Sequence, residues 1–557
     1  MSFEETFKER RRAWHRNKRF TQEKMAAARQ ALADVRNGIP VFDAIKRHPL
    51  PGEGGGYVGK QFLVAAYREM VALGEMEPDR ALLEKIRMKP MRTLSGVTTV
   101  TVLTKPYPCP GKCIFCPTDY RMPKSYLPDE PGAMRALQHD FDPYEQVKDR
   151  IQALHAIGHP TDKIELLILG GTWSSYRKDY QEWFVLRCFQ AMNGMQAEVP
   201  EPAEPGPQHT FSAALIAAQQ INETAGHRCV GLVIETRPDH VDPAELAWLR
   251  HLGVTKVQMG AQSFDDRILA LNKRGHTIAE TRTATDLLRA AGFKIVLHWM
   301  PNLFGATPES DREDFKALWT GFCPDEIKIY PNQLLANAEL YEFWQRGEYT
   351  PYTTEDLVDL IADIKPSIPR YCRVNRVIRD IPSTNVVAGN RRTSLRMDVQ
   401  TELRRRGTVC ECIRCREVRK QDIEVDELRI EEIRYPAGDA EERFISFVTQ
   451  DDRLAGFVRL SLPQRSDPGV LTVFDDLQDA ALIRELHVYG QSLPVGQEKG
   501  GAAQHRGLGT RLLELSEAIA VRHGFHRLAV ISAVGTRRYY EERGYRRGRY
   551  YQVKDLS

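Results

Sequence analysis

The sequence has no long apolar run, no apolar N-terminal segment and little net charge. Without a stretch of about 20 apolar residues, no transmembrane helix and no membrane partner are expected. The first residues, MSFEETFKERRRAWHRNKRF, lack the apolar core of a signal peptide, so a cytoplasmic location is expected. A net charge of only +3 over 557 residues does not by itself indicate nucleic acid.

Cysteine is scarce and unevenly placed. The chain has ten cysteines, and six of them fall in two tight triplets, within residues 109–116 and 410–415. A disulfide framework would spread its cysteines along a small secreted domain. Close triplets in a long chain instead indicate metal sites in a reducing compartment.

The first triplet, Cys109, Cys113 and Cys116, lies in the segment KPYPCPGKCIFCPTDYRMPKSYL. It follows the β-branched run Gly96–Thr104, which predicts a strand. Three thiolates can hold three irons of a [4Fe-4S] cluster and leave the fourth iron open. The C-x3-C-x2-C spacing with an aromatic residue before the last cysteine resembles the radical S-adenosylmethionine superfamily. A zinc knuckle is the alternative, but it needs a fourth ligand nearby, and this loop has no histidine.

Strand and helix patterns alternate after the N-terminal region. The expected strands are Val97–Leu103, Ile164–Leu169, Val230–Glu235, Lys256–Gly260, Ile295–Met300 and Glu326–Tyr330. The expected helices between them are Pro143–Ile157, Gln181–Met192, Phe211–Ala225, Asp242–His251 and Ile278–Ala291. Repeating βα units predict an α/β fold with parallel strands, here an open or partial (β/α)6 barrel. Its active site belongs at the carboxyl ends of the strands, where the cysteine loop lies.

Two further strand ends carry candidate cofactor contacts. The second strand ends in Gly170-Gly171, which would let backbone approach a ligand. The third ends in ETRPD, where Glu235 and Arg237 could hold ribose hydroxyls and a carboxylate. By contrast, the proline-rich stretch Ala197–Gln208 is interpreted as an extended surface insertion without chemistry.

The region after the last expected strand is rich in arginine. Residues 371–392 could line a phosphate track, or they could form a salt-bridged strand. Cys410, Cys412 and Cys415 follow in the spacing C-x-C-x2-C, which predicts a structural zinc site with one outside ligand. Cys372 and Cys323 are the candidates for that ligand, and three free thiols are the alternative.

The last part of the chain has a different pattern. A strand is expected at Leu482–Gly490, followed by the loop Gln504–Thr510 with the sequence QHRGLGT at the start of a helix. A second strand is expected at Arg527–Ser532 and a short helix at Arg537–Gly544. Backbone N–H groups and the helix dipole at such a glycine-rich start favour a pyrophosphate.

The order of these C-terminal elements is similar to the GNAT acetyltransferase fold, which binds acetyl-coenzyme A. Together with MPKSYLPDEPGAMRA, GGTW, ETRPD, NKRGHT, KIYP, RDIPS, RELHVYG and QHRGLG, it resembles the catalytic subunit of Elongator and its stand-alone prokaryotic homologues. That resemblance implies an acyltransferase that uses acetyl-CoA and S-adenosylmethionine radical chemistry. The expected product is a carboxymethyl precursor at C5 of uridine 34, the wobble position of tRNA.

The resemblance also assigns residues. The cluster ligands fall on Cys109, Cys113 and Cys116, and the zinc ligands on Cys410, Cys412 and Cys415. The acetyl-CoA contacts fall on Lys163, Glu485, Leu486, His487, Val488, Gln504, Gly507, Leu508, Gly509, Thr510 and Tyr540. Glu485 or a water bound by Tyr540, which neighbours Tyr539, is expected to assist thioester hydrolysis.

A basic N-terminal segment resembles the tRNA-binding extension of the family. Its candidate contacts are Arg10, Arg11, Arg12, Lys18 and Arg19. A solvated basic helix is the alternative reading of such a patch. Helices are expected to follow at Gln22–Val35 and Gln61–Ala72.

The expected organisation has four parts. These are a basic helical tRNA-binding segment (residues 1–92), a radical S-adenosylmethionine domain (93–370), a linker with the zinc site (371–424) and a GNAT domain (425–557). The expected partners are a tRNA anticodon stem-loop, the two small molecules, an electron donor and a second copy in a homodimer. The acetyl site and the cluster site are expected to face one another. The alternative function is protein lysine acetylation beside a structural iron–sulfur domain.

Overall fold

The computed structural model describes residues 20–51, 56–196, 198–419, 423–464, 467–489 and 507–556. The basic residues Arg10, Arg11, Arg12, Lys18 and Arg19, and Gln504 of the glycine-rich loop, lie outside them. The chain divides into two compact units, Met1–Thr93 with Asp149–Thr161 and Leu94–Lys148 with Asp162–Ser557. Among the described residues, no helix is both long and apolar enough to cross a membrane.

The smaller unit is helical. Its helices are α2 (Gln22–Arg36), α3 (Val41–Arg47), α4 (Lys60–Ala72) and α5 (Arg80–Ile86). Thr21 caps α2, because its side chain accepts a hydrogen bond from the Lys24 N–H. The helices pack on an alanine- and leucine-rich core that includes Ala28 and Leu63. Both helices expected here are confirmed.

The larger unit begins with a parallel sheet in the order β1-β2-β3-β4-β5-β6-β7. Its strands are β1 (Thr98–Leu103), β2 (Lys163–Leu169), β3 (Arg228–Thr236), β4 (Lys256–Gln262), β5 (Lys294–Trp299), β6 (Glu326–Ile329) and β7 (Arg373–Arg376). The six expected strands and their parallel pairing are confirmed. The seventh, β7, comes from the arginine-rich stretch and pairs with β6.

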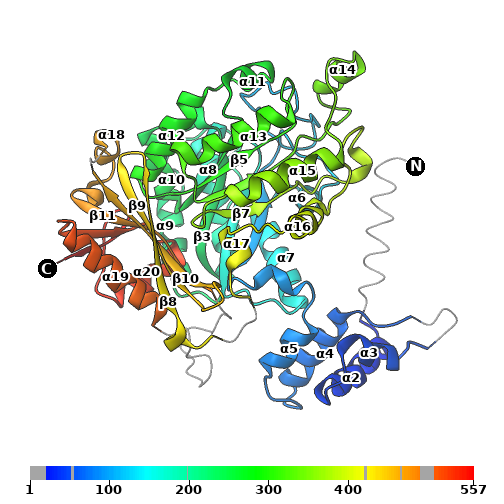
Figure 1. Cartoon of the computed structure of the whole chain (residues 1–557). Helices are drawn as coiled ribbons and strands as arrows, with labels where there is room; N and C mark the ends of the chain where they lie inside the picture. Colours follow the sequence, from blue (N-terminus) through cyan, green and yellow to red (C-terminus); the bar gives the residue numbers. More distant parts are fainter. Residues whose placement is uncertain are drawn as a thin grey trace. The chain divides into compact units, whose positions relative to one another are not determined.

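Helices connect these strands and cover the sheet, as Figure 1 shows for α10, α12 and α13. They are α6 (Pro131–Gln138), α7 (Pro143–Ala156), α8 (Lys178–Met192), α9 (Ser212–Asn222), α10 (Pro243–Leu252), α11 (Asp266–Leu271), α12 (Ile278–Ala290), α13 (Pro308–Ala317), α14 (Leu340–Gln345) and α15 (Thr354–Ile364). Two more, α16 (Leu395–Arg405) and α17 (Ile413–Arg416), follow β7. Local signals set their ends. For example, Asp242 caps α10 with Pro243 in its first turn, and Gly253 ends it at φ 92°.

A second, mixed sheet follows in the order β13-β14-β12-β11-β10-β9-β8. Its strands are β8 (Arg429–Ala437), β9 (Ala440–Val448), β10 (Leu454–Pro463), β11 (Ala480–Val488), β12 (Arg527–Val530), β13 (Arg546–Arg547) and β14 (Gln552–Asp555). Its helices are α18 (Pro468–Leu471), α19 (Leu508–Arg522) and α20 (Arg537–Glu541). The expected C-terminal strands and helices are therefore present.

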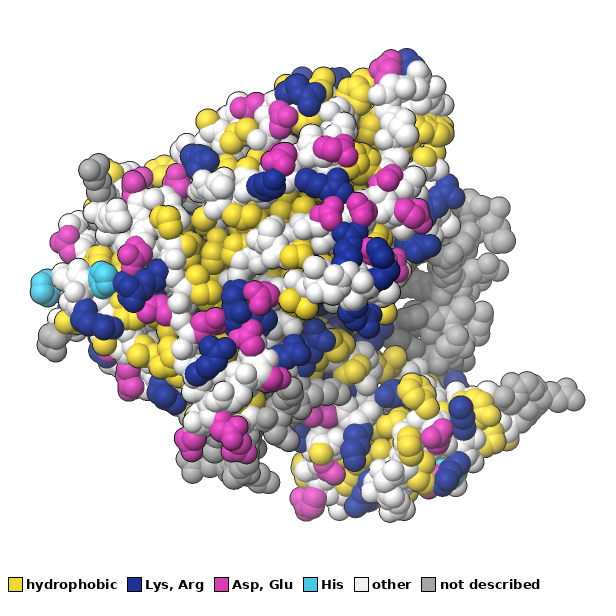
Figure 2. Space-filling model, viewed as in Figure 1, with side chains coloured by type: hydrophobic (Ala, Val, Ile, Leu, Met, Phe, Trp, Pro, Cys, Tyr) yellow, Lys and Arg dark blue, Asp and Glu magenta, His cyan; other side chains and the backbone are white. Residues whose placement is uncertain are grey.

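Charge on the surface is mixed in sign. Figure 2 shows Lys and Arg side chains interspersed with Asp and Glu. Arg312 and Arg406, for instance, both pair with Asp359 and Asp363. Water and salt screen the attraction within such exposed pairs, so they contribute little to stability.

Candidate active site

The cysteine loop lies at the carboxyl end of β1, as the βα rule predicts. The backbone N–H of Ile114 donates to the Asn272 carbonyl at 3.2 Å, and the N–H of Leu340 donates to the Ile114 carbonyl at 2.8 Å. A Cβ placed on Gly111 would lie 3.6 Å from the sulfur of Cys109 and 3.7 Å from that of Cys113. The two sulfurs therefore converge beside a position where the glycine leaves room.

Two arginines surround these thiols. Nη1 of Arg274 donates to the Cys113 sulfur at 3.5 Å, and Nη1 of Arg237 donates to the Arg274 carbonyl at 2.9 Å. A hydrogen bond with Cys116 and the charges of both arginines lower the pKa of Cys113, although burial opposes this. Three free thiols in a cationic setting are the donor set that an iron–sulfur cluster requires, so the residues fit that group.

The two triplets differ in spacing. Within the described residues, the sulfurs of Cys410, Cys412 and Cys415 lie within 4.8 Å of one another, and the first triplet forms no such group. A single zinc ion with Zn–S bonds of about 2.3 Å brings its sulfur ligands to about 3.8 Å from one another. The second triplet is thus the size of a one-metal site, and the first is more widely spaced.

Of the two candidates for a fourth ligand at the second triplet, Cys372 lies closer. Its carbonyl accepts the Ile413 N–H at 2.9 Å, and burial together with the charge of Cys412 raises the pKa of its thiol. The Cys323 thiol instead lies near the carbonyls of Trp319 and Pro436. Cys372 is therefore the nearer of the two along the backbone, but among the described residues its sulfur does not belong to the group within 4.8 Å.

The glycine pair at the end of β2 holds the cysteine loop in place. A Cβ on Gly170 would lie 1.7 Å from Oγ1 of Thr104, where β1 leads into that loop, and Gly171 has a φ of 89°. The Tyr176 hydroxyl contacts the carbonyls of Lys105 and Gly170, each at 3.0 Å. Only glycine fits this close approach, so the pair has a structural task whether or not it also contacts a cofactor.

The other strand-end residues lie around the same loop. Glu235 accepts the Tyr126 hydroxyl at 2.9 Å and pairs with Lys328 at 3.3 Å. Nε and Nη2 of Arg237 also donate hydrogen bonds to the two carboxylate oxygens of Asp239. The structure therefore gathers the features that the sequence placed at successive strand ends. Sequence reasoning missed Arg274, although it stands in the NKRGHT motif.

The arginines of residues 371–380 are held in ion pairs. Arg373 pairs with Glu417 at 3.0 Å, and Arg379 pairs with Glu130 at 2.8 Å. Arg376 pairs with Asp380, also at 3.0 Å. Of the two alternatives for this stretch, the structure contains the salt-bridged strand.

The candidate acetyl site lies where β11 and β12 separate. These strands pair over Ala480–Ile483 only, whereas β11 continues to Val488. The backbone of Glu485, Leu486, His487 and Val488 therefore leaves β12 on that side. Gly507, at φ 101°, precedes α19, and a Cβ on Gly509 would lie 2.4 Å from the Tyr539 hydroxyl and 3.8 Å from Cγ2 of Val488.

The start of α19 and the helix α20 complete this site. Leu508 is fully buried, and the Thr510 hydroxyl accepts a hydrogen bond from Nε of Arg543 at 3.1 Å. The ring of Tyr540 packs edge-on against Tyr539, with centroids 5.3 Å apart. Five predicted contacts, Val488, Gly509, Thr510, Tyr539 and Tyr540, are thereby brought together.

The carboxylate of Glu485 is already held in ion pairs. It pairs with Lys294 of β5 and, at 2.9 Å, with Arg459 of β10. Burial raises its pKa, but the charges of Lys294 and Arg459 outweigh burial and lower it. Burial also lowers the pKa of His487 to about 4, so that imidazole is neutral. Glu485 would have to leave two partners before it could act as a base.

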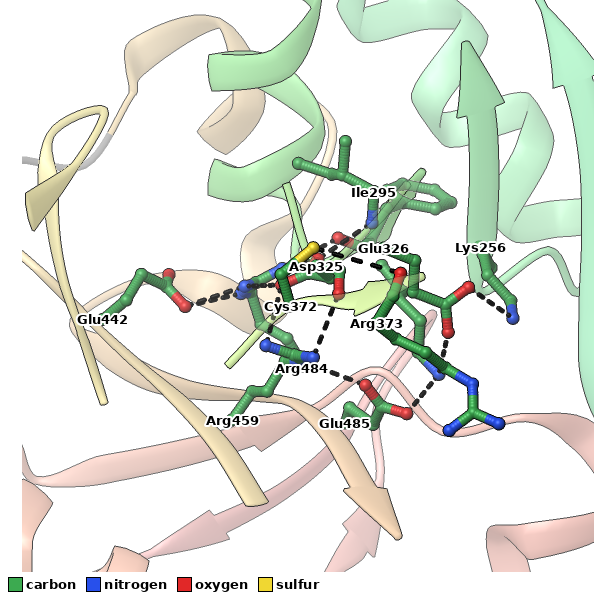
Figure 3. A network of polar contacts seen from close by, with 12 residues as sticks. Lys256, Ile295, Asp325, Glu326, Cys372, Arg373, Glu442, Arg459, Arg484 and Glu485 are labelled. Carbon is green, nitrogen blue, oxygen red and sulfur yellow. Dashed lines mark hydrogen bonds and ion pairs between the residues drawn. The ribbon is translucent and has the colours of Figure 1, made fainter. Parts of the chain in front are cut away.

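The second sheet docks on the ends where the barrel strands begin. Lys294 and Lys163 are the first residues of β5 and β2, and Asp325, which precedes β6, binds Arg484 of β11 (Figure 3). The cysteine loop lies at the opposite strand ends. A six-residue strand such as β1 spans about 20 Å, so these two ends of the sheet are well separated, and the expectation that the two sites face one another stays a prediction.

Polar side chains lie between the two ends. Lys294 and His298 share one face of β5, and Glu326 and Lys328 share one face of β6, because side chains alternate along a strand. Lys294 lies 3.7 Å from Glu326, and Lys328 reaches Glu235 near the cysteine loop. A ladder of charged groups thus runs along the sheet from one site to the other.

The fold and the two sites define a protein that joins a radical S-adenosylmethionine domain to a GNAT acetyltransferase domain. The Radical SAM superfamily matches residues 107–318, the Radical_SAM C-terminal domain matches 324–405, and the Acetyltransferase (GNAT) family matches 410–545.

Relatives that match most of the chain place it more closely. It is 42% identical to a tRNA uridine(34) acetyltransferase of Dehalococcoides mccartyi over 84% of this chain and 99% of that protein. It is 35% identical to human Elongator complex protein 3 over 86% of this chain and 87% of that protein. The structure of Methanocaldococcus infernus Elp3 with an N-terminal deletion superimposes with a TM-score of 0.69 at 36% identity, covering 83% of this chain and all of that one. The chain belongs to the family of these proteins.

Proposed function

We propose that this protein is a tRNA uridine(34) acetyltransferase, which uses acetyl-CoA and S-adenosylmethionine radical chemistry to modify C5 of the wobble uridine. The observation that carries the proposal is the presence of both sites in one compact unit. The identity to relatives of that name, which spans most of both chains, supports it.

In this proposal Cys109, Cys113 and Cys116 would hold a [4Fe-4S] cluster. When bound, that cluster supplies the one-electron chemistry that cleaves S-adenosylmethionine. Arg274 and Arg237 offset the negative charge of the thiolates from the protein side. Gly170, Gly171 and Glu235 line the same strand ends and are the proposed contacts of S-adenosylmethionine.

The acetyl-CoA is proposed to bind along the open edge of β11, with its pyrophosphate at the start of α19. Backbone N–H groups at a helix N-terminus favour an anion. Tyr540 and its neighbour Tyr539 stand at this edge, and the uridine must leave the anticodon stack to react.

Four further assignments belong to the proposal. Zinc is assigned to Cys410, Cys412 and Cys415, where three thiols have the spacing of a single ion. An electron donor is needed because reductive cleavage consumes an electron. A homodimer and a cytoplasmic location remain predictions.

The experiment is anaerobic reconstitution with iron and sulfide, followed by incubation with tRNA, acetyl-CoA, S-adenosylmethionine and a chemical reductant such as dithionite. Nucleoside mass spectrometry is expected to find the carboxymethyl mass on uridine 34 only when all three substrates are present. Acetylated lysine on added peptides, formed without S-adenosylmethionine, is the result that the alternative function predicts.

The hydroxyl of Tyr540 is expected to matter for acetyl-CoA turnover. Tyr540→Phe removes the hydroxyl but keeps the buried ring. Lys163→Ala removes another of the proposed acetyl-CoA contacts. Each variant should lower acetyl-CoA turnover and uridine modification by about 100-fold. The visible absorption of the cluster should stay unchanged in both variants. Tyr545→Phe is the matched control, since the Tyr545 hydroxyl donates to Glu517 at 3.0 Å within the same group of rings. Full turnover in both test variants would refute these two assignments.

The basic segment is expected to bind phosphates. Replacing Arg10, Arg11 and Arg12 with alanine should weaken tRNA binding and reduce its dependence on salt, because each phosphate contact releases counterions. Binding is measured from 50 to 200 mM salt. Arg404→Ala, Arg405→Ala and Arg406→Ala together serve as a control of equal charge on α16. If the two triple variants have the same salt slope, the segment is a solvated helix.

A further inference from the structure

A second group of metal-ligating side chains lies outside both cysteine sites. It consists of Glu182 of α8, His209 before α9 and His251 in the last turn of α10. One ligand atom from each lies within 4.8 Å of the others. Residues far apart in the sequence are thus brought to one point by three consecutive helical segments.

The carboxylate of this group is fixed in advance. Glu182 is fully buried, and its Oε2 accepts the Phe211 N–H at 2.8 Å. Its Oε1 accepts the Ser212 hydroxyl and lies 2.7 Å from Nε2 of His251. Hydrogen bonds that orient a ligating carboxylate are the usual support of a protein metal site.

The exposed member is also held in position. His209 has a φ of 70°, a strained conformation that is uncommon for a residue other than glycine. Its ring packs edge-on against those of Trp248 and His251, with centroids at 5.3 and 5.1 Å. Nδ1 of His209 lies 3.0 Å from the Ser212 hydroxyl, which therefore contacts all three candidate ligands.

We propose that Glu182, His209 and His251 bind a zinc ion. Two imidazoles and one carboxylate form a three-ligand set that zinc takes up, and water or the Ser212 hydroxyl can fill the fourth position. Binding replaces the His251–Glu182 hydrogen bond, so His251 carries its remaining proton on Nδ1. Because His209 is exposed, the ion can enter from solvent.

Such an ion would hold the end of the proline-rich segment, residues 197–208, because His209 directly follows it. This segment runs along α8, where Trp183 donates to the Val199 carbonyl at 2.8 Å and Arg177 to the Pro202 carbonyl at 2.7 Å. Further along, Glu201 pairs with Lys105 at the start of the cysteine loop. The sequence alone predicts an insertion without chemistry. Here it connects the proposed zinc site to the edge of the active site.

The test uses the full-length protein with Zn2+ as the probe. Equilibrium dialysis against buffered free zinc, followed by metal analysis, is expected to find one zinc equivalent fewer in His209→Ala than in the wild type. At the remaining sites the affinity should be unchanged. His526→Ala, which removes an exposed histidine elsewhere, is expected to match the wild type.

A spectroscopic measurement separates this site from the thiolate sites. Co2+ bound by imidazole and carboxylate gives weak visible bands, whereas thiolate ligands add intense charge-transfer bands in the near ultraviolet. His209→Ala should lose only the weak bands, and an anomalous zinc peak beside Glu182 in crystals should vanish with them. Equal zinc content in the wild type and His209→Ala, or a full set of weak bands in the variant, would refute the proposal.

Discussion

Replacing Cys113 with alanine is expected to abolish 5′-deoxyadenosine formation and uridine modification. Cys113 is the buried central member of the cysteine triplet, and Arg274 donates directly to its sulfur. Two remaining thiols cannot hold three irons, so the loss should exceed about 1,000-fold, the limit of a sensitive chromatographic assay. Binding of tRNA should persist, because it is assigned to other parts of the chain.

The control for this variant is Cys188→Ala. Cys188 is also a fully buried thiol, but it lies in the middle of α8, and burial raises its pKa. It should therefore keep a normal iron content and normal cleavage. Formation of 5′-deoxyadenosine by Cys113→Ala would remove the cysteine loop from the mechanism.

The fold could be predicted from the sequence to a large extent because its signals are local. Apolar strands such as Ile164–Leu169 and glycines such as Gly253 each mark an element boundary within a few residues. The strand β7 carries no such local signal. Its sequence is RVNR. These residues form a strand because Arg373 pairs with Glu417 and because their backbone pairs in parallel with β6.

The candidate site could be predicted less completely, because contacts between domains leave no local pattern. A resemblance marks Glu485 as a site residue, but no sequence spacing indicates that Lys294 neutralises it from another domain. The same holds for His209 and His251, since only the packing of α8, α9 and α10 brings them together. Ion pairs between the two domains also decide which ends of the barrel strands the second sheet contacts.

The ion pairs between the two sheets form a buried network, which is drawn in Figure 3. Arg484 is fully buried and donates to both carboxylate oxygens of Asp325, at 2.6 and 2.8 Å, and to Glu442 at 2.8 Å. Burial raises the pKa of Asp325, but the charges of Arg484 and Arg459 outweigh burial and hold it far below its usual value. The carboxylate therefore depends on its arginines to remain ionised without water.

Arg484→Met is expected to destabilise the protein by about 3–5 kcal/mol, because it removes the hydrogen bonds of Arg484 to the buried Glu442 and Asp325 and leaves Glu442 with Arg289 alone, at 3.9 Å. A fall in the melting temperature at pH 7.5 measures this. Arg405→Met is the control, since its exposed pair with Glu402 should contribute little to stability.

The sign of the pH effect distinguishes lost charge pairing from lost packing. In the wild type, a depressed pKa means that the stabilisation by Asp325 is present above about pH 4 and is lost as the pH falls. In Arg484→Met the orphaned carboxylates have raised pKa values and take up protons on folding. The gap in melting temperature between variant and wild type should therefore narrow from pH 7.5 to pH 4.5. A gap that stays constant would mean that the arginine acts through its volume and not through its charge.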